Sequence, residues 1–471
     1  MPTLLPSYDE SLAWLFARTR AGGERGPARA AALLRALAIP VPPRVVHVVG
    51  TNGKGTVTTM IAAGLTAAGH RTGRFVSPHV EEFRERIAID GVPIPRRAVR
   101  AFVATAMRSI EADRLDPEHP PAFFEWTLAL ALTSFARAGV SAAVLEAGVG
   151  GASDATRAVE PVDLVVLTNV DLDHVDAIGP TLDDIARDKA GAFRRGVPAV
   201  TGARGPALAR VRAEAERIGA PLMVDPRQAD DGLAVAATRG GGATVEDAAA
   251  RLFDLPGDIG LAPHGTRADD ARLAAAAMRL LGLDERAVAA GIMAPPLPAR
   301  GERFLVRGRD VVLDGAHDPA AGLRLADEVG DGYVLLFGAL RRKAGSETLA
   351  ALAGRARHVV LTEAASGEGV VRVPASVSPA PDVVVVPEEA LATAIARCPR
   401  GGRVVVAGSL YLAGRLRPWL RRHGRSAAPL GCTRDGREDP AGAADDAADG
   451  APDRALATAD GPADLLDSRT A

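Results

Sequence analysis

Val45-Val46-His47-Val48-Val49-Gly50-Thr51-Asn52-Gly53-Lys54-Gly55-Thr56 is the stretch that decides the fold of this chain. The β-branched run from Val45 to Val49 is typical of a buried parallel strand, and residues 56–68 place apolar side chains at helical spacing without a proline. The glycines between them let the backbone turn so that successive N–H groups and the helix N-terminus point at one anion. The pattern predicts a strand, a phosphate-binding loop and a helix.

Two side chains of this loop favour a nucleoside triphosphate with a metal ion. Lys54 would place a positive charge near the β- and γ-phosphates, and the Thr56 hydroxyl would reach a Mg²⁺ ion. The spacing departs from the usual G-x-x-x-x-G-K-[ST] motif, because Gly55 separates Lys54 from Thr56. The alternative interpretation is a glycine-rich turn whose lysine is merely solvated.

Lysine is rare in this chain, which makes each lysine informative. Lysine and arginine total 56, and only Lys54, Lys189 and Lys343 are lysines. Lys189 ends the amphipathic segment 182–191, where any cation would suit the helix dipole. Arginine would serve equally well there, so a lysine at this position points to chemistry that needs an amine able to lose its proton.

Length and composition set the outer bounds. A chain of 471 residues with 47% hydrophobic residues should form two domains. A net charge of −2 gives no sign of nucleic-acid or membrane partners. Two cysteines, Cys398 and Cys432, fit no metal or disulfide pattern, and neither a signal peptide nor an apolar run of 18 residues is present. We expect a cytoplasmic, monomeric protein.

Segment patterns divide the chain into two α/β domains and a tail. We expect an ATP-binding domain at 1–294, a Rossmann-like domain at 299–425, and a disordered acidic tail at 426–471. Pro295–Pro298 is the expected hinge. In the first domain we expect helices within 8–38 and at 96–112, 122–138, 182–191 and 269–281, strands at 72–76, 83–92, 142–145 and 164–168, and short strands with Gly-rich turns through most of 202–290. In the second we expect strands at 311–313, 334–337, 358–361, 383–386 and 404–406.

Acidic residues follow two of the expected strands. Glu146 ends the run 142–145, and Asp171, Asp173 and His174 follow the run 164–168. Ligands of parallel sheets gather at the carboxyl ends of the strands, so these side chains favour a shared metal site. Turn chemistry with a helix N-cap is the alternative for the second group. His79, after Ser77-Pro78, is more typical of a loop histidine than of a catalytic base.

At this point the chain resembles the folylpolyglutamate synthase and dihydrofolate synthase branch of the Mur ligases, over about residues 8–422. The motifs that carry this resemblance are Gly50–Thr56, Ser77-Pro78-His79, Phe123-Phe124-Glu125, Leu145–Gly151, Asp154-Ala155-Thr156, Asp173-His174, Asp188-Lys189-Ala190-Gly191, Asp314-Gly315-Ala316-His317 and Gly408–Leu412.

The resemblance implies a P-loop-containing Mur-ligase-type domain followed by a Rossmann-like domain. It implies an ATP-dependent ligase in which a folate or dihydropteroate carboxylate forms an acyl phosphate that L-glutamate then attacks. The implied cofactors are ATP, two Mg²⁺ ions and a CO₂-derived carbamate on Lys189.

The resemblance also implies residue roles. It implies nucleotide binding by Gly50, Thr51, Asn52, Gly53, Lys54, Gly55, Thr56, Asp270, Arg300 and Asp314. It implies metal binding by Thr56, Ser77, Glu146, His174 and carbamylated Lys189. It implies catalytic roles for Lys54, Lys189 and His317, and substrate binding by Pro78, His79, Phe124, Glu125, Asp154, Thr156 and Ser409.

Several positions depart from the family pattern. Arg267 and Asp270 stand where the family has His-Gln-x-x-Asn-Ala, and Asp318 replaces the asparagine of Asp-Gly-Ala-His-Asn-Pro. Arg300 follows Pro298-Ala299 instead of Pro-Gly, and Arg157 replaces the last residue of Asp-Ala-Thr-Asn. An Asn-to-Asp exchange removes two donors and adds a charge. If this chain is a folate ligase, Arg267 and Arg300 should pair with Asp270 and Asp318.

Three other functions are left open by the sequence. A specialised relative could join another acid to another amine. A P-loop ATPase or GTPase switch would leave Lys189 and the second α/β domain unexplained. A non-catalytic nucleotide-binding paralogue should have lost Glu146, His174 or Lys189, and all three are present.

Overall fold

The computed structural model describes residues 5–19, 26–112, 115, 120–228, 250–257, 261, 265–340, 344–365, 367–377 and 380–432. Lys343, residues 229–249 and residues 433–471 lie outside the described residues. The described chain forms two compact units. The first comprises the residues before 258 with Asp269–Pro295, and the second comprises 261, 265–268 and the residues from Pro296 onward.

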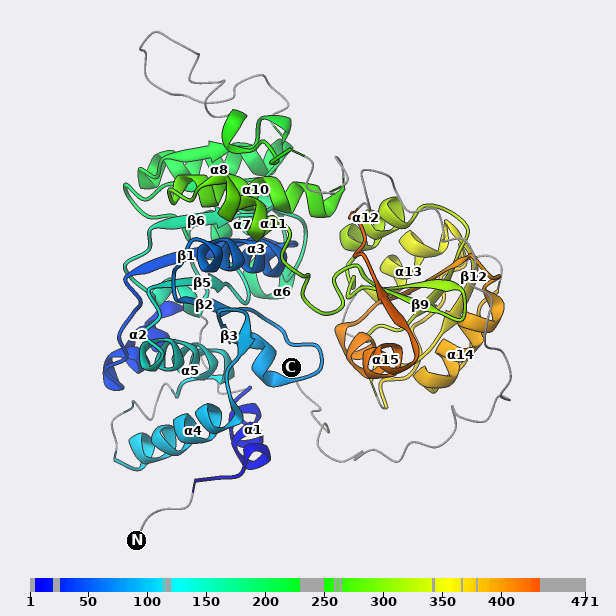
Figure 1. Ribbon diagram of the computed structural model, residues 1–471, viewed down its shortest axis with the longest axis horizontal. Coiled ribbons are helices and arrows are strands. Elements are labelled where there is room, and N and C mark those ends of the chain that lie inside the picture. Colours follow the sequence, from blue (N-terminus) through cyan, green and yellow to red (C-terminus); the bar gives the residue numbers. More distant parts are fainter. Residues whose placement is uncertain are drawn as a thin grey trace. The chain divides into compact units, whose positions relative to one another are not determined.

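The first unit is built on an eight-stranded sheet with the order β4-β3-β2-β5-β1-β6-β7-β8 (Figure 1). Six strands are parallel, whereas β3 and β4 run antiparallel at one edge. The strands are β1 Arg44–Val49, β2 Thr72–Phe75, β3 Ile87–Ile89, β4 Val92–Pro93, β5 Ala142–Glu146, β6 Leu164–Leu167, β7 Ala199–Thr201 and β8 Leu222–Val224.

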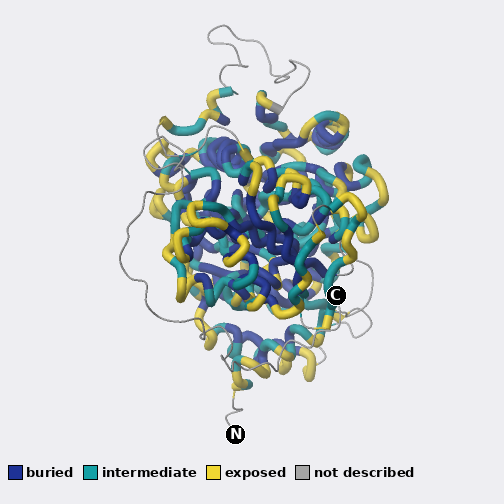
Figure 2. Tube along the Cα trace, turned by 90° about the vertical axis from the view of Figure 1, so that its right-hand side faces the viewer, coloured by how far each residue is buried: buried dark blue, intermediate teal, exposed yellow. Residues whose placement is uncertain are grey.

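Helices cover this sheet because its strands are apolar on both faces. Val45 and Val49 of β1 join a buried core with Phe75, Trp126 and Phe135. Figure 2 shows buried segments inside and exposed segments at outer turns. The helices are α1 Tyr8–Phe16, α2 Pro27–Ala36, α3 Lys54–Ala67, α4 Arg96–Glu111, α5 Phe123–Arg137, α6 Val175–Ile178, α7 Leu182–Ala190, α8 Gly205–Ile218, α10 Thr266–Leu280 and α11 Glu285–Ile292, with 3₁₀ turns η1 Phe83–Arg86, η2 Ala155–Ala158 and η3 Pro226–Gln228.

The second unit has a seven-stranded sheet of order β13-β12-β11-β14-β10-β9-β15. Five strands are parallel as expected, and β9 and β15 add an antiparallel edge that was not expected. The strands are β9 Glu302–Val306, β10 Arg309–Leu313, β11 Tyr333–Phe337, β12 Ala356–Leu361, β13 Asp382–Val383, β14 Arg403–Ala407 and β15 Arg425–Ala427, and the helices are α12 Pro319–Val329, α13 Gly345–Ala353, α14 Pro387–Arg397 and α15 Leu410–His423.

Three expected elements are wrong or incomplete. The first half of the strand expected at 83–92 is the 3₁₀ turn η1, and the strand expected at 383–386 ends at Val383. The segment 202–290 contains the helices α8 and α11 instead of mostly strands and turns. In α8, Pro206 lies in the first turn, Ala207, Val211 and Ala215 repeat every four residues on the buried face, and Gly219 ends the helix at φ +80°. In the described part of the chain, no helix is long and apolar enough to cross a bilayer.

Ordered chain continues beyond residue 425, where the tail was expected to begin. Arg425–Ala427 pairs with β9, Leu430 is buried, and its N–H donates to the Gly301 carbonyl at 2.8 Å. The expected disorder is therefore wrong for residues 426–432. An exposed edge such as β9 can recruit a short following strand, which composition alone does not reveal.

Two truncations should separate the packed segment from the residues after it. Removal of residues 433–471, which are poor in apolar side chains, is expected to leave the melting temperature and activity unchanged. Removal of residues 426–471 also deletes Leu430, whose burial is worth roughly 2 kcal/mol, so the melting temperature should fall by about 4–8 °C. Calorimetry measures both. A fall of several degrees in the shorter truncation would show that residues 433–471 contribute to stability.

Candidate functional site

The loop between β1 and α3 is held in the shape of an anion cradle. Gly50 has φ +144° and Gly53, the N-cap of α3, has φ +79°. A Cβ on Gly50 would lie 2.0 Å from Thr168 Oγ1, and one on Gly53 would lie 2.2 Å from Asp270 Oδ1. Both positions therefore require glycine.

Contacts from the end of β6 fix this loop from the other side. Thr51 N donates to the Asn169 carbonyl at 3.0 Å, and Asn52 N donates to Asn169 Oδ1 at 2.9 Å. Thr168 Oγ1 donates to the Asn52 carbonyl at 2.6 Å. Sequence reasoning gave no role to Thr168, the last residue of the strand predicted at 164–168, or to Asn169, which follows it.

The loop also holds polar groups that suit an anion. Lys54 Nζ donates to the Thr51 carbonyl at 2.9 Å, so the amine lies over its own loop. Within the described residues, Asn52 Nδ2 is buried without a hydrogen-bond partner. A buried, unsatisfied donor beside a helix N-terminus fits a polyphosphate.

Lys189 of α7 lies against this same loop. Its side chain is 1% exposed, and Nζ donates to the Gly50 carbonyl at 2.8 Å. Burial, aided by the Lys54 charge and opposed by Asp173, Asp188 and Asp154, lowers the pKa of Lys189 to about 7. The amine is therefore neutral in a large share of molecules at neutral pH, as reactions of an amine require.

Asp188 holds a second glycine-rich loop beside Lys189. Its carboxylate accepts from Gly151 N at 2.9 Å, Ser153 N at 3.2 Å and Ser153 Oγ at 3.1 Å. A Cβ on Gly151 would lie 2.5 Å from the Lys189 carbonyl oxygen. Asp188 was part of a quoted motif but was given no role.

Among the predicted metal-binding residues, Glu146 and Ser77 are in direct contact. Glu146 ends β5, is 3% exposed, and its Oε2 accepts from Ser77 N at 2.9 Å. His174 N-caps α6 at φ +52°, and its Nε2 lies 3.3 Å from Asp173 Oδ2. In the described part of the chain, no group of three or more His, Cys, Asp or Glu side chains is placed to hold a metal. The carboxylate of Glu146 and the hydroxyls of Thr56 and Ser77 are the hard ligands that Mg²⁺ prefers.

An aromatic cluster lies near the Ser77-Pro78-His79 loop. The rings of Phe16 and Phe123 stack with centroids 5.2 Å apart. Phe83 packs edge-on against Phe16, Phe123 and His79 with centroids 6.0 to 6.2 Å apart, and the His79 ring is tilted against Phe16 at 6.3 Å. Arg86 Nε donates to His79 Nδ1 at 2.8 Å. Burial and the Arg86 charge lower the pKa of His79 to about 3, so His79 is a neutral acceptor rather than a base at physiological pH.

Two further predicted substrate residues have structural partners. Glu125 is buried, pairs with Arg29 at 3.0 Å and accepts from Ala122 N at 2.5 Å at the start of α5. Phe124 packs against Phe75 with centroids 5.5 Å apart, and a Cβ on Gly148 would lie 2.9 Å from the Phe124 ring. The Phe124 ring therefore packs against Gly148 at the start of the glycine loop 148–151.

Asp154 and Thr156 form one buried network. Asp154 Oδ1 accepts from Thr156 N at 2.9 Å and Thr156 Oγ1 at 2.6 Å, and Oδ2 accepts from Val149 N at 2.9 Å. Thr156 Oγ1 also lies 2.7 Å from His47 Nε2. Sequence reasoning treated His47 only as part of a strand.

The second unit brings its own predicted residues together at the end of β10. Asp314 accepts from Gly301 N and Ala316 N, each at 2.8 Å. Burial raises the pKa of Asp314, and the charge of Arg300 opposes that rise. His317 Nδ1 lies 2.9 Å from the Gly315 carbonyl. Ser409 Oγ, which was expected to contact substrate, accepts from Tyr411 N as the N-cap of α15.

Asp318 has a structural role that the sequence did not suggest. Its Oδ1 accepts from Ala321 N at 2.8 Å, which makes it the N-cap of α12. The expected compensation by Arg300 is therefore not needed at Asp318, and the Arg300 charge acts on Asp314 instead. Asp270, in contrast, lies directly against Gly53 of the phosphate loop.

Substitution of Asp318 should test this assignment. Asparagine caps helices about as well as aspartate, so Asp318→Asn is expected to keep activity within about tenfold, a barrier change of roughly 1.4 kcal/mol. Asp318→Ala should lower the unfolding free energy by about 1 kcal/mol because the cap is lost. Denaturant titration and initial rates measure the two effects. If the Asp318→Asn variant were active and the wild type were not, the Asp318 carboxylate would be harmful to the site.

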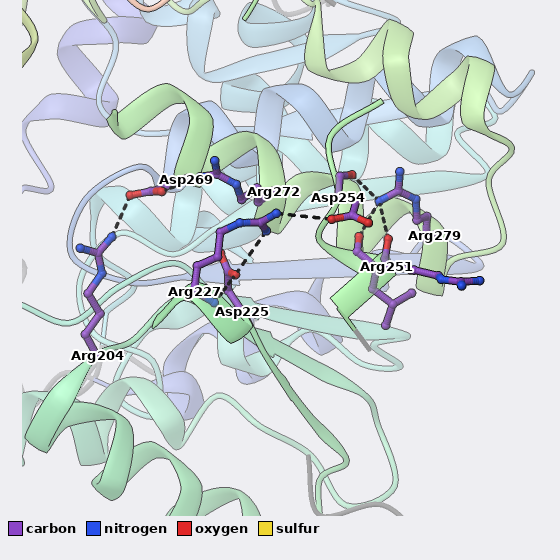
Figure 3. A network of polar contacts seen from close by, with 9 residues as sticks. Arg204, Asp225, Arg227, Arg251, Asp254, Asp269, Arg272 and Arg279 are labelled. Carbon is purple, nitrogen blue, oxygen red and sulfur yellow. Dashed lines mark hydrogen bonds and ion pairs between the residues drawn. The ribbon is translucent and has the colours of Figure 1, made fainter. Parts of the chain in front are cut away.

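Figure 3 shows a polar network that fixes α10. Arg204 and Arg272 pair with the two oxygens of Asp269 at 2.8 and 2.9 Å. Arg227 N donates to the buried Asp225 at 3.0 Å, and burial raises the pKa of Asp225. The network holds α10 in place. Asp270, which follows Asp269 in this helix, places its carboxylate against the phosphate loop.

Comparison with known proteins agrees with this geometry. Residues 48–224 match the Mur ligase middle domain. The probable bifunctional folylpolyglutamate synthase/dihydropteroate synthase of Haloferax volcanii is 37% identical over 80% of this chain and 46% of its own length. The folylpolyglutamate synthase of Lacticaseibacillus casei is 35% identical over 66% of this chain and 74% of its own length.

Solved structures extend the likeness to both units. Escherichia coli FolC in complex with DHPP and ADP has a TM-score of 0.73 and 26% identity, covering 88% of this chain and 99% of that chain. A bifunctional folylpolyglutamate synthase/dihydrofolate synthase with Mn, AMPPNP and L-glutamate bound has a TM-score of 0.70 and 26% identity, covering 89% and 100%. The chain spans about half the length of the two archaeal relatives it matches, at 46% and 52%.

Proposed function

Because this chain belongs to the folylpolyglutamate synthase/dihydrofolate synthase family, with its Mur ligase middle domain, we propose that it uses ATP to add L-glutamate to a folate or dihydropteroate carboxylate. The observation that carries this proposal is the 2.8 Å contact between the buried Lys189 amine and Gly50 of the phosphate loop. A simple nucleotide-binding loop has no need of a second, buried lysine.

The reaction must first activate a poor acyl donor. The acid's carboxylate oxygen attacks the γ-phosphorus of ATP, the bond to the β-γ bridging oxygen breaks, and ADP leaves. Lys54 and the N–H groups of Gly50–Thr56 stabilise the charge that develops on the phosphate oxygens. Bound Mg²⁺, held by Thr56, Ser77 and Glu146, would supply further charge neutralisation.

The second step forms the amide. The neutral amine of glutamate attacks the acyl carbon, and the C–O bond to phosphate breaks. Phosphate leaves with its electron pair, and the new amide nitrogen loses one proton, which the departing phosphate takes up. Water competes for the acyl phosphate, so the site must exclude it. As the family resemblance implies, Asp314 is proposed to bind the nucleotide and His317 to take part in catalysis.

Lys189 is proposed to act as a carbamate. Its neutral amine attacks CO₂, a C–N bond forms, and loss of one proton leaves a carboxylate-like group in place of a cation. Such a group, with His174, would hold a second Mg²⁺. The proposal is supported by the pKa of about 7 and by the choice of lysine in an arginine-rich chain.

Carbamylation should depend on pH in a defined direction. Because the folded pKa of Lys189 is about 7, the reactive neutral fraction rises from about one tenth at pH 6 to about nine tenths at pH 8. After preparation in CO₂-free buffer, the rate of reactivation per dissolved CO₂ should therefore rise by about ninefold over this range. Reactivation that does not change with pH would contradict the assignment.

The aromatic cluster of Phe16, Phe83 and Phe123 is proposed to receive the ring system of the acid. Aromatic faces suit a flat heterocycle. Pro78, His79, Phe124 and Glu125 are proposed to line or support this region, and Asp154 and Thr156 are proposed to bind the acid. A cytoplasmic location and a monomeric state remain predictions.

The decisive experiment measures ADP release by purified protein. Dihydropteroate, tetrahydrofolate and unrelated acids are each supplied with glutamate or other amino acids, and products are identified by mass. Turnover with a pteroate or folate and glutamate is the expected result. Turnover only with another acid would favour a specialised ligase, a candidate that the Asp270 carboxylate against Gly53 favours. ATP binding without any turnover would favour a non-catalytic paralogue.

A further inference from the structure

His47 is a buried polar residue in an otherwise apolar strand. Its side chain is 1% exposed, and its neighbours on the same face of β1, Val45 and Val49, belong to the hydrophobic core. Its Nε2 lies 2.7 Å from Thr156 Oγ1. Within the described residues, its Nδ1 is buried without a hydrogen-bond partner. An unsatisfied buried nitrogen is costly, which calls for a compensating role.

The direction of each hydrogen bond follows from counting protons. Both oxygens of Asp154 already accept from backbone N–H groups, those of Thr156 and Val149, each at 2.9 Å. The single hydroxyl proton of Thr156 is donated to Asp154 Oδ1 over 2.6 Å. With Asp154 ionised, Thr156 Oγ1 can then only accept from His47, so Nε2 carries the proton and Nδ1 carries the lone pair.

The charges around the ring favour this neutral form. Arg157 and Arg194 are the cations that act on His47, and burial together with these two charges lowers its pKa to about 3. Burial raises the pKa of Asp154, and its hydrogen bonds from the Thr156 hydroxyl and from the backbone N–H groups of Thr156, Val149 and Gly148 oppose that rise. The chain from His47 through Thr156 to Asp154 is therefore a fixed set of directed hydrogen bonds.

The chain ends at the glycine loop that borders the reacting groups. Asp154 is the N-cap of η2. It also accepts a hydrogen bond from Val149 N and so holds the glycine loop 148–151. Asp188, which precedes Lys189, holds the other part of the loop through Gly151 N and Ser153 N. The same strand β1 leads directly into the phosphate loop after Val49.

We propose that His47 is a positioning residue for the acid substrate: its Nε2–H orients Thr156 and Asp154, and thereby fixes the glycine loop relative to the phosphate loop. The inference rests on the proposed function, because Asp154 and Thr156 are proposed to bind the acid. The proposed role is indirect, because His47 would act through Thr156 and Asp154.

The first test is the tautomer. In protein labelled with ¹⁵N-histidine, the signals of His47 are identified by their loss in His47→Leu. The expected pattern is a neutral ring with the proton on Nε2 and an unprotonated Nδ1 from pH 5.5 to 8. A proton on Nδ1, or a charged ring in this range, would overturn the hydrogen-bond chain.

The second test separates positioning from packing. His47→Leu removes the unsatisfied nitrogen and should leave the melting temperature unchanged or higher, yet raise KM for the acid at least tenfold with kcat and KM for ATP within twofold. His47→Gln can place an amide N–H near the position of Nε2 and should restore KM to within threefold. The shorter His47→Asn reaches only the Nδ1 position and should behave like His47→Leu.

A histidine of the second unit provides the matched control. His358 Nε2 also contacts a carboxylate, Asp382 at 2.9 Å, but lies in the second sheet. His358→Leu should not change KM for the acid. If His47→Leu also leaves that KM unchanged, or if glutamine fails to restore it, the positioning role is wrong.

Hydrogen exchange keeps the inference testable if no pteroate or folate is turned over. The Val149 and Thr156 amide protons both bond to Asp154, so their exchange should be at least tenfold faster in His47→Leu than in the wild type. Absence of turnover with this faster exchange would reject the proposed acid but keep the positioning of the loop. Unchanged exchange would reject the positioning itself.

Discussion

Lys189→Arg is expected to lower the ligase rate by on the order of 10³-fold, the scale seen when an electrostatic group of an active site is lost. The side chain is 1% exposed and its Nζ meets the Gly50 carbonyl, so a guanidinium has little room. More fundamentally, a guanidinium does not lose its proton and forms no carbamate with CO₂. Single-turnover ADP formation measures the effect on chemistry apart from product release.

Chemical rescue makes this result specific. Lys189→Ala should regain part of its rate with acetate or another short carboxylate, which can occupy the place of the carbamate. Lys54→Ala is the matched control, because it removes a cation from the same loop and a carboxylate cannot replace that charge. Full activity of Lys189→Arg, or equal rescue of both alanine variants, would rule out the carbamate.

Gly50→Ala should weaken ATP binding by about 100-fold, or roughly 2.7 kcal/mol. A Cβ would lie 2.0 Å from Thr168 Oγ1, and φ +144° is strained for any residue other than glycine, by about 1–3 kcal/mol. Movement of Thr168 would also release the Asn52 carbonyl, which accepts its hydroxyl proton at 2.6 Å. Isothermal titration with a non-hydrolysable ATP analogue measures the loss.

Gly69→Ala is the control for backbone strain alone. Gly69 has φ +89°, and a Cβ there would meet nothing within 4 Å. It should cost about 1 kcal/mol of stability and leave ATP affinity unchanged. If Gly50→Ala binds the analogue as tightly as Gly69→Ala does, the loop does not hold the phosphates.

The site could be predicted from sequence where its signals are local. A β-branched run followed by Gly50, Gly53 and Lys54 identifies a strand, a loop and a helix without reference to the rest of the chain, and the structure confirms these elements. The same holds for Glu146 at the end of β5. The loop and Glu146 lie at the same edge of the sheet, because parallel strands share one carboxyl edge and Glu146 is in register with Val48 of β1.

Partnerships between distant residues could not be predicted in this way. Arg29 meets Glu125 across 96 positions of sequence, and Thr156 meets His47 across 109. The N-cap of α12 is a local signal that could have been predicted. Asp318 was instead considered only as a departure from the family motif. The helices α8 and α11 carry local signals that were overlooked: Pro206 and Gly219 at the two ends of α8, and Asp284 as the N-cap of α11.

The burial of Lys189 has a kinetic corollary. An amine enclosed between Gly50 and α7 meets dissolved gas only when that part of the chain opens transiently. Gain and loss of the proposed carbamate would then be slow compared with turnover. The activity at a given moment would then depend on the CO₂ concentration to which the enzyme was exposed earlier. A sudden rise in CO₂ should appear as a lag in the progress curve, and a sudden removal of CO₂ as a slow decay of the rate.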